Sequence, residues 1–278
     1  MADRTSWQGY GPVDGARPSR PRSRERVYNP VVGPDGRRWL DYELAAETLA
    51  VTAEREPGLP PDDAVDREPE LDWFDRASRP PPLADVRPYD VPGGVARPDP
   101  QLQADLEEVL PHAAARFVDP RTGWGSLLNG PGPPGEDPFR ATNAVECALS
   151  GLSTWHGEPV VAAPRRPEYD RIGRPVLSGE PGGVSRAERW LGHRFEYAGN
   201  GAEAYHRIGR RLAEGGPGSG AMLINRWAVG GCHTWNAFNA GGQVVWADLQ
   251  RGDCAERPLY PGVTGIFCVA IDRGGTRL

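Results

Sequence analysis

The sequence predicts an α+β fold in which helices come first and an antiparallel sheet follows. Apolar residues recur at helical spacing between residues 101 and 213, whereas strand-length apolar runs separated by glycines dominate after residue 220. The chain has 278 residues, of which 38% are hydrophobic and nine are tryptophan, so it is long enough to bury a sizeable core. Helices in one half and strands in the other are typical of α+β domains.

We expect residues 1–100 to be a linker or delivery segment and residues 101–278 to form the compact domain. Residues 1–35 are rich in Arg, Pro, Gly and Ser and cannot bury enough apolar surface to become ordered. One amphipathic helix is expected over residues 38–56, where apolar side chains recur at helical spacing among good helix formers. The remaining stretch is acidic and proline-rich.

Two aromatic residues interrupt that acidic stretch. Trp73 and Phe74 stand together in an otherwise polar segment, and such a pair often docks on a neighbouring domain. We therefore expect part of this region to wrap around the compact domain.

The spacing of apolar residues and the positions of glycine and proline predict the elements of the domain. A helix from residue 101 should end or kink near Pro111, because proline lacks the amide hydrogen that a helix interior needs. The expected helices are 101–117, 144 to about 157, 185–191 and 202–213. The expected strands are 221–229, 232–239, 243–249 and 263–271, with a hairpin turn at 240–242.

Charge, apolar runs and cysteine spacing exclude several classes of protein. A net charge of −6 gives no basic footprint, so nucleic acid is not an expected partner, and no apolar run is long enough to span a membrane. The N-terminus lacks the apolar core of a signal peptide, which fits export into a target cell by a specialised secretion system or a truncated chain. The four cysteines form no CxxC pair, and a zinc site at Cys232, His233 and Cys254 is only weakly indicated. We expect no metal and no cofactor.

Three separated positions form a candidate catalytic constellation. Asn143 is a good helix N-cap, so residue 144 should lie at the positive end of a helix, where a cysteine would have a lowered pKa. This chain has Ala144 there. The hairpin should bring His233 and Asp248 onto neighbouring strands, where the carboxylate could orient the imidazole. A nucleophile facing such a pair is the layout of a cysteine hydrolase or acyltransferase.

Three further residues near this constellation have two interpretations each. Asn236 and Gln250 could orient the catalytic groups or a substrate amide, but a strand asparagine and a turn glutamine are also ordinary. Cys147, three residues after position 144, is an alternative nucleophile, although a buried small apolar side chain is the better supported interpretation.

Three segments of the sequence resemble the papain-fold toxin domains known as toxin glutamine deamidases, which occur in bacterial polymorphic toxins. These segments are RATNAVECALSGLSTWHG, GGCHTWNAFNAGG and VVWADLQRG. The resemblance covers about residues 118–272 and implies a papain-like fold, with N-terminal helices packed on an antiparallel sheet. It also implies a Cys-His-Asp triad, whose members fall on Ala144, His233 and Asp248. The implied reaction converts a glutamine side chain of a target protein to glutamate and ammonia.

Alanine at the nucleophile position departs from this family pattern. Three explanations are open: a deliberate Cys→Ala substitution, which we favour, a natural pseudoenzyme that acts as a binding module, or a nucleophile at Cys147. A related cysteine protease or transglutaminase is the alternative chemistry. The expected partners are the target protein and a cognate immunity protein.

Overall fold

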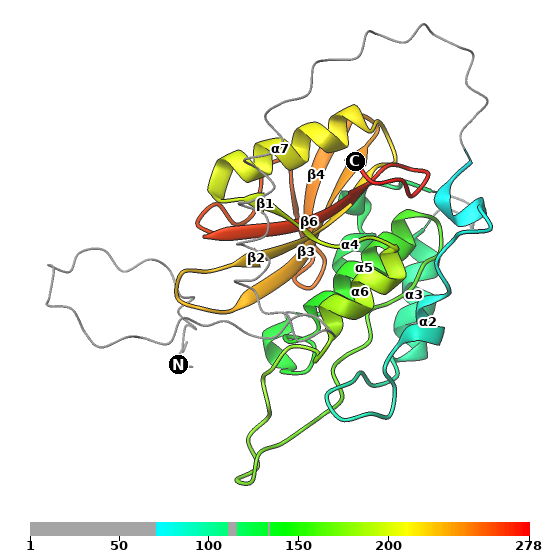
Figure 1. Cartoon of the computed structure of the whole chain (residues 1–278). Helices are drawn as coiled ribbons and strands as arrows, with labels where there is room; N and C mark the ends of the chain where they lie inside the picture. The colour runs from blue at the N-terminus through cyan, green and yellow to red at the C-terminus, as the bar shows by residue number, and fades with distance from the viewer. Residues whose placement is uncertain (1–70, 111–115, 133) are drawn as a thin grey trace, which may run out of the picture.

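The computed structural model describes residues 71–110, 116–132 and 134–278, and Figure 1 shows their arrangement. The helix expected at 38–56 lies outside the described residues. A six-stranded, fully antiparallel sheet runs through the molecule in the order β1-β6-β2-β3-β4-β5. Its strands are β1 (Glu196–Gly199), β2 (Gly220–Arg226), β3 (Cys232–Ala240), β4 (Gln243–Asp248), β5 (Asp253–Ala255) and β6 (Gly265–Ile271).

Four of these strands, β2, β3, β4 and β6, confirm the apolar runs seen in the sequence. The two edge strands were not predicted, because β1 spans four residues and β5 three, which is too short for an alternating pattern to be visible. Among the described residues, none of the helices has both the length and the apolar character that a membrane span requires.

The main helices also match the predicted segments. The α-helices are α2 (Leu83–Val86), α3 (Pro100–Val109), α4 (Trp124–Leu127), α5 (Ala144–Trp155), α6 (Gly183–Leu191) and α7 (Gly201–Glu214), and the 3-10 turns are η1 (Trp73–Asp75), η2 (Pro120–Thr122) and η3 (Pro134–Glu136). The helix expected from residue 101 ends at Val109, just before Pro111. The single-turn helices α2 and α4 were not predicted, since four residues carry no periodicity.

Helices cover both faces of the sheet, as Figure 1 shows. α5 packs on one face, mainly against β3 and β2, while α7 packs on the other. Alternating side chains of each strand therefore enter two separate cores. The core under α5 includes Met222, Phe238, Phe267 and Val269, and the core under α7 includes Leu223, Trp235, Trp246 and Ile266.

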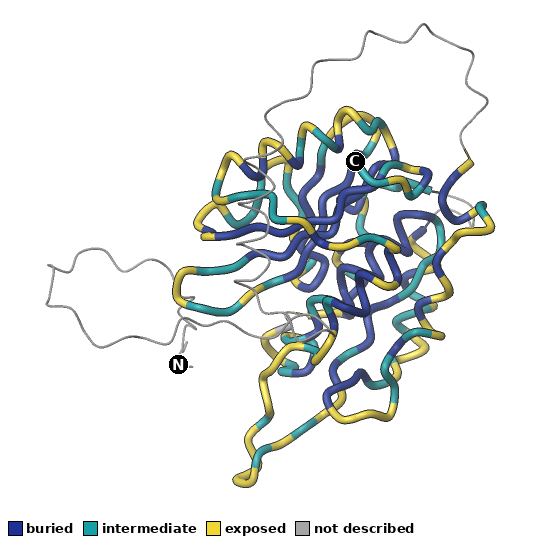
Figure 2. The backbone as a smooth tube through the Cα atoms, viewed as in Figure 1, coloured by how far each residue is buried: buried dark blue, intermediate teal, exposed yellow. Residues whose placement is uncertain are grey.

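α5 is the central helix of the fold. Ten of its twelve residues are buried, and Figure 2 shows the buried backbone continuing from this helix into the strands. A helix that is buried nearly all round must be covered on more than one side. The sheet covers one side of α5, and residues from 73 to 106 contribute to the core on the other.

The aromatic pair at the start of the described chain docks on this core. Trp73 and Phe74 are 5% and 4% exposed, and the ring of Phe74 stacks on the buried His156 at a centroid distance of 5.0 Å. The Nδ1 atom of His156 lies 3.2 Å from the carboxylate of Asp72. Trp73 and Phe74 therefore pack on the domain, as expected for a region that wraps around it.

Two helical glycines give opposite predictions for the same substitution. A Cβ atom at Gly151 of α5 would come within 2.2 Å of the Leu249 side chain and 3.0 Å of Asn236, whereas at Gly209 of α7 it would meet Trp246 at an ordinary 3.7 Å. We expect Gly151→Ala to lower the free energy of unfolding by about 1–3 kcal/mol through overpacking. Gly209→Ala should raise it by up to about 1 kcal/mol through helix propensity. Urea unfolding of both variants measures the difference, and equal effects would contradict the packing of α5 on β3.

Candidate active site

The side chain at the N-cap position of α5 does not cap the helix. Asn143 occupies the N-cap position, but its side chain makes no hydrogen bond to the N–H groups of the first turn. Its Nδ2 donates instead to Oδ1 of Asn129 at 2.8 Å and to the carbonyl of Ala163 at 3.1 Å. The positive end of the helix therefore stays open at the half-buried Ala144.

The loop before α5 is braced by Arg140, which sequence reasoning missed. Its guanidinium donates to the carbonyls of Asn129, Gly130 and Pro131 at 2.5, 2.8 and 2.9 Å. These bonds are backbone contacts within one loop, and no sequence pattern marks them. Arg140 thereby fixes the approach of the chain to Ala144.

Gln250 connects the start of α5 to the end of β4. Its Nε2 donates to Oδ1 of Asn143 at 3.1 Å, and its backbone N–H donates to Oδ1 of Asp248 at 3.1 Å. Gln250 is therefore a bridge between the helix N-cap and the carboxylate. Of the two roles open for this residue, the geometry favours orientation of the site.

Asn236 lies between the sheet and α5, and not beside His233 and Asp248. It is fully buried between β3 and α5, where its Nδ2 donates to the carbonyls of Ala148 and Ala221 at 3.2 and 3.3 Å. It anchors the middle of the central helix to the sheet and makes no hydrogen bond to His233 or Asp248 among the described residues.

His233 and Asp248 are in direct contact. The antiparallel pairing of β3 with β4 brings the start of one strand beside the end of the other, and Nε2 of His233 lies 2.8 Å from Oδ2 of Asp248. An ionised carboxylate only accepts hydrogen bonds, so Nε2 carries the proton. In the neutral imidazole, Nδ1 is then the basic atom.

Asp248 is kept ionised by its surroundings. Burial alone would raise the pKa of its carboxyl, but hydrogen bonds from His233 and Tyr260 and the nearby charge of Arg251 lower it below the usual value. Since the folded state has the lower pKa, this carboxylate stabilises the fold above the unfolded pKa. That contribution is lost as the pH falls through the folded value.

Two aromatic side chains flank His233, and sequence reasoning identified neither. The ring of Tyr260 meets the imidazole edge-on at a centroid distance of 5.5 Å, and Trp227 lies at 6.2 Å. Both belong to irregular segments, where no periodicity indicates which way a side chain points. Trp235 lies on β3 with His233, and Trp246 lies on β4 with Asp248. Both pack in the core under α7 instead.

Cys147 is a buried thiol in the first turn of α5. It is 1% exposed, and its Sγ donates to Oδ1 of Asn143 at 3.3 Å. Burial raises the pKa of the Cys147 thiol well above its usual value, and the negative charges of Asp248 and Glu146 raise it further. These properties oppose a role as nucleophile, because the thiolate is the reactive form.

Thiol labelling of the folded chain checks this view of Cys147. We expect the exposed Cys232 to react with a disulfide reagent first, and the buried Cys147 and Cys268 to react only on unfolding. Digestion and mass spectrometry would locate the label. Rapid labelling of Cys147 in the native protein would reopen it as a nucleophile.

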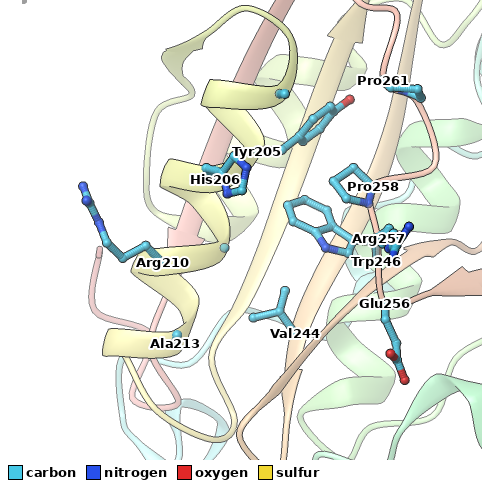
Figure 3. Close-up of a pocket in the computed structure, with 12 residues that line it drawn as sticks. Tyr205, His206, Arg210, Ala213, Val244, Trp246, Glu256, Arg257, Pro258 and Pro261 are labelled. Atoms are coloured by element: carbon cyan, nitrogen blue, oxygen red, sulfur yellow. The ribbon is translucent and has the colours of Figure 1, made fainter.

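A cleft of about 830 Å³ lies apart from this site, on the face of the sheet that α7 covers. Figure 3 shows its walls: Tyr205, His206 and Arg210 come from α7, and Pro258 and Pro261 come from the segment after β5. Among the described residues, no group of three or more His, Cys, Asp or Glu side chains is placed to hold a metal ion.

Comparison with protein families identifies the segment that carries the site. Residues 142–253 match the family model described as papain fold toxin 1, glutamine deamidase. This match supports a papain-fold toxin glutamine deamidase domain in this part of the chain. The matched segment begins one residue before the N-cap of α5 and ends at the first residue of β5, so it contains positions 144, 233 and 248. No curated protein and no solved structure matched the chain.

Proposed function

We propose that this deamidase domain hydrolyses the side-chain amide of a glutamine in a target protein, with position 144 as the nucleophile position. The carrying observation is the connected path from the N-cap of α5 to the imidazole. Asn143 contacts Gln250, the backbone of Gln250 contacts Asp248, and Asp248 contacts His233. The family match supplies the substrate class, a glutamine side chain.

In this proposal, each group has a role when a cysteine occupies position 144. Nδ1 of His233 accepts the thiol proton, and the thiolate attacks the γ-carbonyl carbon of the glutamine. The imidazolium then gives its proton to the amide nitrogen, and ammonia leaves as a thioester forms. Water, deprotonated by Nδ1, attacks the thioester and releases glutamate and the thiol.

The uncapped N-terminus of α5 stabilises the negative charge that develops on the amide oxygen. Because Asn143 does not cap the first turn, the backbone N–H of residue 144 is available as a donor at the positive end of the helix. The same end of the helix stabilises a thiolate. One feature thus serves both the nucleophile and the tetrahedral intermediate.

Ala144 removes the nucleophile and leaves the rest of this arrangement in place. Alanine has no atom that can attack an amide, so the chain as given should bind a substrate without turning it over. A natural pseudoenzyme would have the same geometry, and a related protease or transglutaminase would share the thiol chemistry. An introduced Cys→Ala substitution remains our preferred explanation.

Delivery follows from the same proposal. A toxin of this family acts on a target cell, and we propose that a specialised secretion system translocates it, with the part of residues 1–100 that precedes the docked Trp73 and Phe74 as a delivery segment. The target protein carries the substrate glutamine, and a cognate immunity protein protects the producing cell.

The test restores a cysteine and looks for deamidation. Ala144→Cys and the chain as given are incubated with a panel of glutamine-containing proteins, and ammonia release and a mass gain of about one dalton per glutamine are recorded. We expect at least about a 10³-fold higher rate for Ala144→Cys, abolished again by His233→Ala in that background. Tight binding of a partner by the alanine chain, with no turnover by the restored protein, would favour the pseudoenzyme. Cleaved peptide bonds would favour the protease.

A further inference from the structure

Tyr260 lies beyond the segment that matches the family, yet it contacts both members of the His–Asp pair. Its hydroxyl donates a hydrogen bond to Oδ2 of Asp248, the same oxygen that accepts from His233. Its ring meets the imidazole of His233 edge-on, with 80° between the two planes. One side chain therefore holds the carboxylate through its hydroxyl and the imidazole through its ring.

Helix α7 fixes the backbone of Tyr260. Tyr205 of α7 donates its hydroxyl to the carbonyl of Tyr260 at 2.8 Å, and that hydroxyl in turn accepts from Nδ2 of the buried Asn225 at 2.9 Å. Figure 3 shows Tyr205 extending from α7 toward the segment that carries Pro258 and Pro261. A hydrogen-bond chain from α7 and β2 thus helps to set the position of Tyr260, in addition to the contacts that Tyr260 makes with Trp235 on β3 and Asp248 on β4.

Among the described residues, four hydrogen bonds and one longer ion pair, from Nε of Arg251 at 3.7 Å, reach the carboxylate of Asp248. Oδ1 accepts the backbone N–H groups of Gln250 and Arg251 at 3.1 and 3.3 Å, and Oδ2 accepts from His233 and Tyr260. Two carboxylate oxygens offer about four lone-pair positions, so the acceptor capacity is used. The carboxylate can neither rotate nor gain another donor without losing one of these bonds.

Tyr260 can act only as a donor in this arrangement. Burial raises the pKa of its phenol, and the adjacent charge of Asp248 raises it further, so the hydroxyl stays protonated. The direction of the hydrogen bond is therefore fixed. A neutral donor on Oδ2 also draws negative charge away from the oxygen that faces His233.

We propose that Tyr260 is a positioning residue that locks the Asp248 carboxylate and, through it, the orientation of the His233 imidazole. Its catalytic consequence rests on the proposed function, whereas its effect on His233 does not. Without the hydroxyl, Asp248 keeps its two backbone hydrogen bonds, the contact with His233 and the ion pair with Arg251, but it loses one of its four hydrogen bonds and turns more readily about its terminal torsion. The imidazole of His233 is then held less firmly, so its Nδ1 atom no longer points in one fixed direction.

The first test observes His233 directly in the chain as given. The Nε2 proton of an imidazole bonded to a carboxylate exchanges slowly with water and resonates downfield, and the chain has only five histidines. We expect this resonance in the unmodified chain and in Tyr89→Phe, whose hydroxyl contacts only Arg87 among the described residues. Tyr260→Phe should broaden or abolish it at a temperature at which the variant remains folded. An unaltered resonance in Tyr260→Phe would overturn the proposal.

The second test measures the consequence for the reaction. In the Ala144→Cys background, Tyr260→Phe should lower kcat by about 10- to 100-fold and leave KM nearly unchanged, because the substrate does not touch the phenol. Tyr89→Phe should leave both constants unaltered. A resonance change without any activity of the restored protein would retain the positioning role and reject the deamidase function. Activity that survives Tyr260→Phe intact would reject the role of Tyr260 alone.

Discussion

Replacing Asp248 with asparagine in the Ala144→Cys background should lower kcat by about 10³- to 10⁴-fold. The amide keeps the shape of the carboxylate, but its NH₂ group can face Nε2 of His233 and so favour the wrong imidazole tautomer. Asparagine also removes the negative charge that stabilises the imidazolium during the reaction. Deamidation of the substrate identified with the restored protein gives kcat.

A neighbouring carboxylate provides the control. Asp253 is exposed on β5 and pairs in register with Asp248, so Asp253→Asn changes the same charge nearby without touching His233. We expect this variant to retain its activity within about threefold, since an exposed charge is largely screened. Equal losses in both variants would mean that net charge, and not the contact with His233, controls the rate.

Replacing Glu146 with glutamine should destabilise the protein by about 3–5 kcal/mol, the largest effect on folding that we expect. Glu146 is fully buried on α5, where its carboxylate contacts Nε of Arg87 at 2.5 Å and a terminal nitrogen of Arg186 at 2.8 Å. Arg186 also pairs with Glu180. A neutral amide leaves Arg87 as a buried cation without a charged partner, which is costly.

The pH dependence separates this effect from a loss of packing. Burial alone would raise the pKa of Glu146, but Arg87 and Arg186 lower it, so its stabilisation is present above the unfolded pKa and is lost as the pH falls. The gap in Tm between the unmodified chain and Glu146→Gln should therefore narrow in acid. Glu214→Gln, at an exposed pair with Arg210, should change Tm little at any pH.

The sequence predicted the parts of the fold that carry a long periodic signal. The apolar runs gave β2, β3, β4 and β6, and helical spacing gave α3, α5, α6 and α7. The hairpin turn at 240–242 was sufficient to place His233 beside Asp248, because antiparallel pairing across a short turn leaves little freedom of register.

The sequence could not predict the contacts that irregular segments make. Arg140 and Asn129 act through backbone carbonyls of a loop, and Tyr260 reaches Asp248 from a turn after β5. Asn143 was expected to cap α5 with its side chain, but the partners that draw its carboxamide inward, Asn129 and Gln250, come from distant parts of the chain. Such tertiary hydrogen bonds leave no periodic trace.

The most direct test of the site needs no knowledge of the target protein. In Ala144→Cys, the rate of alkylation of the introduced thiol by iodoacetamide is followed against pH, with the modified peptide identified by mass spectrometry. The account predicts a midpoint below about pH 7, well under the value of about 8.5 for a free cysteine, and an upward shift in His233→Ala. An introduced thiol that titrates near pH 8.5 in both backgrounds would show that position 144 does not face His233, and would contradict the proposed active site.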